Sequence, residues 1–267
     1  MSSELEDWHP RGIDPTTPSP ARMYDYYLGG KDNFQADREA AEQALGAVAN
    51  GRELVLENRR FLGRAVRYLV GQAGIRQIID LGTGLPTQNN VHEVAHGIAP
   101  DTRVAYVDND PIVLAHARAL LGGGGSTDTV QVIEADMRHP AEIIEGTQGF
   151  IDFERPVAVL FVAVLHFVSD DYDPHATVAR IRDATAPGSY LALSHVEASP
   201  KTAAAERAWD RATTQANWRS RSEVERFFDG FDLVDPGLVY TPEWRPDGGE
   251  FPGQAILAGV GRKSVNA

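Results

Sequence analysis

The sequence predicts an α/β fold with a doubly wound, largely parallel sheet. Short apolar runs, typical of strands buried on both faces, alternate with stretches of helical periodicity. Three of these runs end in or beside an aspartate, at residues 78–80, 103–108 and 130–136. Because the carboxyl ends of parallel strands meet at one edge of a sheet, we expect a ligand site where these acids gather.

Three helices are expected ahead of the sheet. Tyr24 and Tyr27 lie at helical spacing, and the pair Gly29-Gly30 ends that helix. A second helix is expected over residues 34–48. A third, over residues 54–70, has its apolar side chains at core spacing and should pack on the sheet.

The first strand leads into a glycine-rich turn. Glycine at positions 82 and 84 lets the chain turn sharply and lets a ligand approach the backbone closely. A dinucleotide-binding loop would place its third glycine or alanine at Thr87, which follows Pro86, and it has no need of Asp80 at the strand end. A carboxylate beside the turn instead suits a ligand with a cationic amino group.

The acids of the next two strands extend this interpretation. Asp108 can accept both hydroxyls of a ribose, and Asp136 can accept from the exocyclic amine of adenine while Met137 packs on the ring. Together with Asp80 they suit S-adenosylmethionine. Any one of these acids could instead be a helix cap or a turn former. Three of them at successive strand ends favour the ligand.

The remaining elements follow in the order that such a sheet requires. A fourth strand over residues 157–164 is apolar throughout, and a fifth is expected over residues 189–195. A long helix is predicted over residues 202–218. Two last strands, residues 231–234 and 255–260, are expected to pair antiparallel and close the sheet.

In this order of elements, residues 55–262 resemble the class I S-adenosylmethionine-dependent methyltransferases. The unusual run at residues 21–34 narrows the resemblance to the bacterial S-adenosyl methyltransferase family, formerly labelled a domain of unknown function. The resemblance implies a seven-stranded, Rossmann-like methyltransferase sheet with an N-terminal helical extension, S-adenosyl-L-methionine as cofactor, and no settled acceptor. The residues expected to bind the cofactor are Asp80, Gly82, Thr83, Gly84, Asp108, Asn109, Asp136, Met137 and Ala163.

The N-terminal helices are expected to cover the cofactor and to build the acceptor pocket. His166, just past the fourth strand, could take a proton from an acceptor as the methyl group transfers. It could also be a loop histidine, since methyl transfer can rely on positioning an activated donor without a general base. In a purely structural alternative, Tyr24 and Tyr27 pack the N-terminal arm against the core, and Lys31 is exposed to solvent. The candidate acceptor-binding residues are Tyr24, Tyr27, Lys31, Asn33 and Phe34.

Residues 92–96 match the H-E-x-x-H pattern of zinc peptidases, with His92 and His96 one helical turn apart. The third histidine of the extended pattern is missing, and the helix directly follows the glycine turn. We therefore expect no metal site, and a zinc peptidase is a remote alternative. Acids after the fourth strand could also hold a divalent ion, but Asp173 capping a helix that begins at Pro174 is favoured.

Length and charge limit the possible functions. The 267 residues can form one large core, predicted at residues 55–267, behind an arm and helical lid at residues 1–54. A net charge of −13 disfavours a nucleic-acid partner and leaves a small molecule as the expected acceptor. With no apolar run of about 18 residues, no membrane partner is expected and a cytoplasmic protein is predicted. A non-catalytic module that binds S-adenosylmethionine or its homocysteine product is a further alternative.

Overall fold

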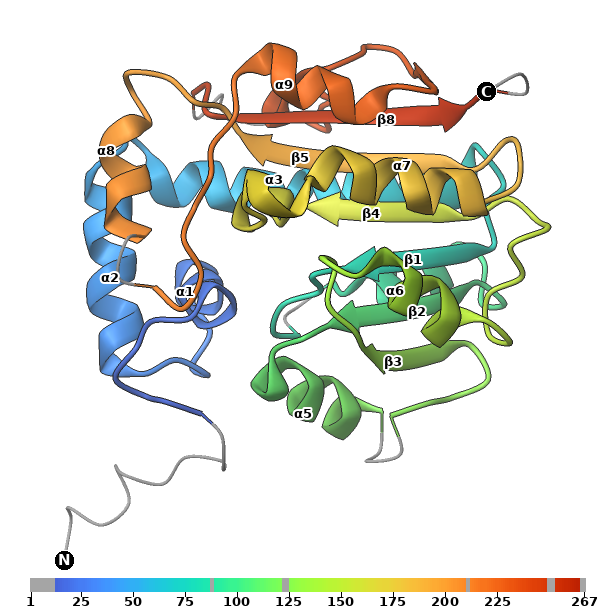
Figure 1. The fold of residues 1–267 in the computed structure, drawn as a ribbon, viewed down its shortest axis with the longest axis horizontal. Helices are drawn as coiled ribbons and strands as arrows, with labels where there is room; N and C mark the ends of the chain where they lie inside the picture. Colours follow the sequence, from blue (N-terminus) through green and yellow to red (C-terminus); the bar gives the residue numbers. More distant parts are fainter. Residues whose placement is uncertain (1–12, 87–88, 122–124, 210–211, 249–252, 265–267) are drawn as a thin grey trace, which may run out of the picture.

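The chain folds as a central sheet with helices on both faces and a helical extension at one edge (Figure 1). The computed structural model describes residues 13–86, 89–121, 125–209, 212–248 and 253–264. The first twelve residues of the predicted arm and Thr87 lie outside these ranges.

Within the described residues the sheet has eight strands, in the order β3-β2-β1-β4-β5-β8-β6, and β7 pairs with β8. β1 to β5 are parallel, and β8 runs antiparallel to β5, β6 and β7. The predicted doubly wound class is confirmed, with one strand more than expected because two residues of the loop before β8 pair with it. The strands are β1 (Gln77–Leu81), β2 (Arg103–Asp108), β3 (Val130–Glu134), β4 (Ala158–Val162), β5 (Tyr190–Val196), β6 (Phe231–Leu233), β7 (Val239–Tyr240) and β8 (Ile256–Lys263).

Several helices begin where proline occupies the first turn, a position that needs no backbone N–H. Short 3₁₀ turns, η1 to η5, connect other elements: Leu165–Phe167, Asp170–Tyr172, Arg207–Trp209, Arg226–Phe228 and Thr241–Glu243. The α-helices are α1 (Pro20–Tyr27), α2 (Gln35–Gly46), α3 (Gly51–Gly71), α4 (Val91–His96), α5 (Pro111–Leu120), α6 (Pro140–Thr147), α7 (Pro174–Ala184), α8 (Ala203–Glu206) and α9 (Arg221–Glu225). None of the described helices is long and apolar enough to span a membrane.

The long helix predicted over residues 202–218 is wrong. Among the described residues of this stretch, the chain forms only α8 and η3, and two later backbone N–H groups bond to distant segments instead of to carbonyls four residues earlier. Thr213 N donates to the Pro18 carbonyl, and Asn217 N donates to the His166 carbonyl. This stretch therefore fastens the N-terminal extension to the loop after β4.

Alternate strand residues face two separate cores, as expected for strands covered on both faces. Ile79 and the strand side chains on the same face of the sheet pack against α6, α7 and α9. Ile78 and its equivalents pack against α3 and α4, where Phe61 meets the fully buried Trp244 edge-on at 5.4 Å between ring centroids. The sheet is thus held from both sides, which fixes its carboxyl edge.

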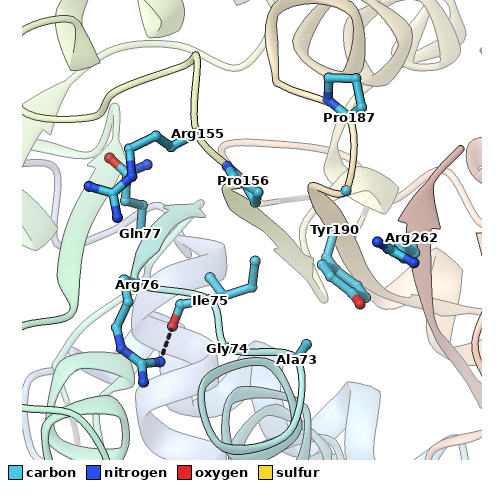
Figure 2. A pocket seen from close by; sticks show the side chains of 11 residues that line it. Ala73, Gly74, Ile75, Arg76, Gln77, Arg155, Pro156, Pro187, Tyr190 and Arg262 are labelled. Carbon is cyan, nitrogen blue, oxygen red and sulfur yellow. Dashed lines mark hydrogen bonds between the residues drawn. The ribbon is translucent and has the colours of Figure 1, made fainter. Parts of the chain in front are cut away.

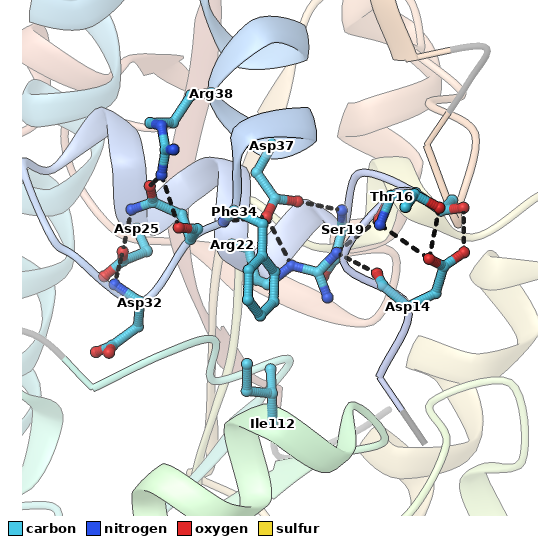
Figure 3. A network of polar contacts seen from close by, with 12 residues as sticks. Asp14, Thr16, Ser19, Arg22, Asp25, Asp32, Phe34, Asp37, Arg38 and Ile112 are labelled. Carbon is cyan, nitrogen blue, oxygen red and sulfur yellow. Dashed lines mark hydrogen bonds and ion pairs between the residues drawn. The ribbon is translucent and has the colours of Figure 1, made fainter. Parts of the chain in front are cut away.

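The N-terminal helices lie beside the carboxyl ends of β4 and β5, at the left in Figure 1. A buried ion pair joins them, with Arg22 Nε 2.8 Å from Asp37 Oδ2. Asp37 also accepts from the backbone N–H groups of Ser19 and Phe34 (Figure 3). Because an unpaired buried charge is costly, this network fixes α1 against α2. The Ser19 hydroxyl in turn donates to Asp110, which begins α5, and so ties the extension to the sheet edge.

Candidate functional site

The turn after β1 depends on its two glycines. Gly82 and Gly84 have φ values of +65° and +67°, in the left-handed region that favours glycine. A Cβ at Gly82 would lie 2.1 Å from Val164 Cγ2, whereas a Cβ at Gly84 would meet no atom of the described residues within 4 Å. Gly82 is therefore required for packing, and the backbone at Gly84 is open to a ligand. The Thr83 hydroxyl steadies the turn by donating to the Asp80 carbonyl.

Two buried carboxyl groups flank this turn. Burial raises the pKa of Asp80 to about 7; the Arg59 guanidinium lowers it in part, and the Asp108 carboxyl raises it further. Burial also raises the pKa of Asp108. Asp108 accepts hydrogen bonds from Gly84 N at 3.0 Å and from Asp110 N at 2.9 Å. Asp80 thus has an unfavourable environment for its negative charge, which a cationic ligand would improve.

Asp136 follows β3 and is engaged by neighbouring side chains. Arg138 forms an ion pair with it, and Asn109 Nδ2 donates to it at 3.1 Å. Burial alone would raise the pKa of Asp136, but the hydrogen bonds from Arg138 outweigh burial and lower it. Met137 reaches the Gly82 turn, since its Cε would lie 3.1 Å from a Cβ added there. The predicted adenine-side residues therefore lie together, with Arg138 competing for the Asp136 oxygens.

The end of β4 is strained and is held by two buried polar side chains that sequence reasoning missed. Ala163 has a φ of +55°, unusual for a residue with a Cβ. Its backbone N–H donates to Ser194 Oγ at 3.0 Å, and Ser194 Oγ donates to Asn58 Oδ1 at 2.6 Å. The sequence did contain a signal for Asn58. It lies three and four positions before the core residues Phe61 and Leu62, and this helical spacing places a polar side chain on the buried face of α3.

His166 lies in η1, immediately after this strained strand end. It is buried, its Nδ1 has no hydrogen-bond partner, and its ring packs against Phe167 and His195. Burial lowers the pKa of His166 well below 6.5, and the neighbouring His195 and Arg219 lower it further. The imidazole is therefore neutral at physiological pH and only weakly basic.

Arg219, another residue that sequence reasoning missed, organises the loop around His166. Its buried guanidinium donates to the carbonyls of Leu165 and Val168 and to the Asp170 carboxylate. It also lies 3.2 Å from His195 Nε2. Because His195 Nδ1 lies 2.7 Å from the Val196 carbonyl, that nitrogen carries the proton and Nε2 accepts from the guanidinium. Burial lowers the pKa of His195 to about 3, in agreement with a neutral ring.

The two tyrosines predicted to contact the acceptor lie on α1 and point toward different neighbours. The Tyr24 hydroxyl accepts a hydrogen bond from Asn58 Nδ2 at 2.9 Å. Tyr27 is buried in an aromatic cluster that includes Trp209. Both lie beside the carboxyl edge of the sheet, in agreement with a covering role for α1.

The other predicted acceptor-binding residues have different surroundings. Lys31 is exposed. Asn33 donates to the buried carboxylate of Asp25 at 2.8 Å and so closes the turn between α1 and α2. Phe34 lies under the Arg22 guanidinium and packs toward Ile112 of α5 (Figure 3). These residues shape the extension, and Tyr24 and Tyr27 are nearer to the strained end of β4.

A cavity of about 220 Å³ lies far from these residues, at the amino ends of the strands (Figure 2). It is bordered by Gln77 and Tyr190, the first residues of β1 and β5, and by Arg262 near the end of β8. Ligands of doubly wound sheets bind at the opposite, carboxyl edge. We therefore assign the site by the chemistry of the carboxyl edge and not by cavity size.

Comparison with known proteins identifies the family. A family model described as S-adenosyl methyltransferase matches residues 6–264. The chain belongs to the S-adenosyl methyltransferase family. A putative methyltransferase from Thermobifida fusca is 43% identical, with a TM-score of 0.89, and the match covers 97% of this chain and 99% of that one. A DUF574 family protein from Streptomyces avermitilis is 37% identical, with a TM-score of 0.86 and coverages of 94% and 99%. A search of curated proteins finds no match.

The carboxyl edge of this member of the S-adenosyl methyltransferase family fits the cofactor that the family name implies. Asp80 offers a buried carboxyl group whose charged form is destabilised until a cation approaches. Gly84 leaves the backbone beside it open, and Asp108 lies within hydrogen-bond distance of Gly84 N. The three groups together suit an ammonium and a ribose at neighbouring positions.

The H-E-x-x-H residues have structural roles in this family member. His92 Nδ1 lies 2.7 Å from the Tyr106 hydroxyl, and His96 Nε2 lies 2.9 Å from the Thr102 carbonyl. Glu93 accepts from the backbone N–H at the start of its own helix. No group of three metal-ligating side chains occurs in the described ranges. These contacts hold α4 on β2.

Proposed function

We propose that the chain transfers a methyl group from S-adenosyl-L-methionine to a small-molecule acceptor beneath α1. The observation that carries the proposal is the buried Asp80 carboxyl, with its pKa raised to about 7, beside the open backbone of Gly84. In a member of an S-adenosyl methyltransferase family, this combination supports a site for the cofactor's ammonium group.

When bound, S-adenosylmethionine supplies a methyl group already activated by its sulfonium. The residues of this chain would then bind and orient it. Asp80 pairs with the ammonium, Asp108 accepts from the ribose hydroxyls, and Asp136 accepts from adenine, with Met137 on the ring. Thr83 fixes the turn, and the remaining contacts come from Gly82, Gly84, Asn109 and Ala163.

The acceptor site is proposed between α1 and the loop after β4. Tyr24 and Tyr27 support it by their place beside the carboxyl edge, while Lys31, Asn33 and Phe34 border it through the turn that follows α1. The net charge of −13 favours a small acceptor over a nucleic acid.

His166 is the proposed proton acceptor, but its low pKa limits it to a transient role. Positioning of the acceptor against the methyl group would then supply most of the rate acceleration. The weak basicity of His166 also favours a second candidate function. A module that binds S-adenosylmethionine as a sensor would need no base, and it would bind the cofactor without turnover.

Calorimetric titration with S-adenosylmethionine, S-adenosylhomocysteine and NAD tests the proposal. We expect micromolar or tighter binding of the first two and no binding of NAD. Asp108→Ala should abolish that binding, whereas Asp101→Ala, an exposed acid near the start of β2, should leave it unchanged. Binding of NAD alone would contradict the proposal. Release of S-adenosylhomocysteine with a panel of small acceptors separates the enzyme from the sensor.

A further inference from the structure

A chain of hydrogen bonds links α1 to the end of β4. Ala163 N donates to Ser194 Oγ at 3.0 Å, Ser194 Oγ donates to Asn58 Oδ1 at 2.6 Å, and Asn58 Nδ2 donates to the Tyr24 hydroxyl at 2.9 Å. Ser194 and Asn58 are fully buried. The N-terminal extension is therefore connected to the edge of the sheet where the cofactor is proposed to bind.

The two distances at Asn58 fix the direction of this chain. A separation of 2.6 Å suits an O–H···O bond, so the amide oxygen faces Ser194, and 2.9 Å suits an N–H···O bond to Tyr24. The Tyr24 oxygen is therefore an acceptor here, and its own proton is left to donate. No residue in the described part of the chain accepts that proton. Burial raises the pKa of Tyr24, so the phenol stays protonated.

A positive charge acts on this phenol. The Arg59 guanidinium, next to Asn58 on α3, lowers the pKa of both Tyr24 and Asp80 and so acts on both groups. Arg59 Nη2 also donates to the Asn89 carbonyl at 3.1 Å, just past the glycine turn. Arg59 thus acts electrostatically on both the phenolic donor of α1 and the buried carboxyl at the end of β1. An α-amino acid, with its ammonium and carboxylate on one carbon, matches this arrangement.

We propose that Tyr24 and Arg59 bind the carboxylate of the methionine part of S-adenosylmethionine, while Asp80 holds its ammonium. Asn58 and Ser194 are positioning residues that aim the phenol. The inference rests on the proposed function and assigns Tyr24 to the cofactor instead of the acceptor. α1 then lies over the cofactor's amino-acid end.

Two ligands test the inference by calorimetry. S-adenosylhomocysteine carries the amino acid, whereas 5′-methylthioadenosine shares the adenosine and thioether but lacks both charged groups. Tyr24→Phe, which removes only the hydroxyl, should weaken S-adenosylhomocysteine binding about tenfold or more, because a hydrogen bond to a charged group is lost. Binding of 5′-methylthioadenosine should not change. Tyr26→Phe is the matched control, since its hydroxyl donates to Glu42 on the surface.

Ser194→Ala should weaken S-adenosylhomocysteine selectively too, but by less than Tyr24→Phe, because Asn58 is misaligned without removal of the donor. A purely structural role would lower the affinity for both ligands equally, and that result would overturn the inference. Unchanged affinity of Tyr24→Phe for both ligands would also overturn it. If the wild type binds neither ligand, the proposed function itself fails, and the two failures are thus distinguishable.

Discussion

Asp80→Asn should stabilise the ligand-free protein and weaken cofactor binding. Burial raises the Asp80 pKa from 3.8 to about 7, so the folded state disfavours the carboxylate. One pKa unit corresponds to about 1.4 kcal/mol, so the charge costs the fold about 4 kcal/mol at pH 8. A buried asparagine adds a cost of its own, about 1–3 kcal/mol if its amide lacks partners. The cost of the buried amide does not vary with pH, so it does not affect how the stability difference between Asp80→Asn and wild type changes with pH.

The sign of this dependence follows from proton binding. The folded state holds the Asp80 proton more tightly than the unfolded chain does, so the penalty is absent below pH 3.8 and grows until about pH 7. The stability difference between Asp80→Asn and wild type should therefore increase by about 2–3 kcal/mol from pH 5 to pH 8.

Urea unfolding of both proteins at pH 5, 6 and 8, with no ligand, measures this difference. Asp101→Asn is the control, since it makes the same carboxyl-to-amide change at a side chain that is 79% exposed. A constant difference for Asp80→Asn would refute the reasoning. In calorimetry, the same variant should bind S-adenosylhomocysteine about tenfold or more weakly, because an amide cannot pair with the ammonium.

Three further outcomes are expected. In urea unfolding, Gly82→Ala should lower the free energy of unfolding by about 1–3 kcal/mol more than Gly84→Ala, because only Gly82→Ala places a Cβ against Val164. Equal losses for the two variants would contradict the packing argument. Arg219→Ala should cost about 2–4 kcal/mol by leaving the Val168 carbonyl and His195 Nε2 without a donor, and an unchanged unfolding midpoint would exclude this role. Because the His166 pKa lies well below 6.5, methyl transfer at saturating S-adenosylmethionine, whose ammonium keeps Asp80 ionised, should show no inflection near pH 6.5. A midpoint there under these conditions would argue against a buried neutral imidazole.

The sequence was sufficient where a feature repeats or follows from topology. Asp80, Asp108 and Asp136 could be placed at one edge because parallel strands end together, and the alternation of apolar runs predicted the two faces. Tertiary contacts have no such signal. The helix expected over residues 202–218 is replaced by backbone bonds to distant segments, and Arg219 acts through carbonyls that no pattern reveals.

Three unfavourable features of this fold lie where the ligand is proposed to bind. Asp80 is buried with a raised pKa, Ala163 has a left-handed backbone, and His166 Nδ1 lacks a partner, all near the carboxyl edge. At the amino edge, where the cavity of about 220 Å³ lies, the buried Lys263 Nζ donates to two carbonyls, and burial lowers its pKa. Strain and desolvated charge persist only where the surrounding fold holds them, and a bound cofactor can relieve the charge. Ligand binding at the carboxyl edge should therefore recover stability that the empty site lacks, and S-adenosylhomocysteine should raise the wild-type unfolding midpoint more than that of Asp80→Asn.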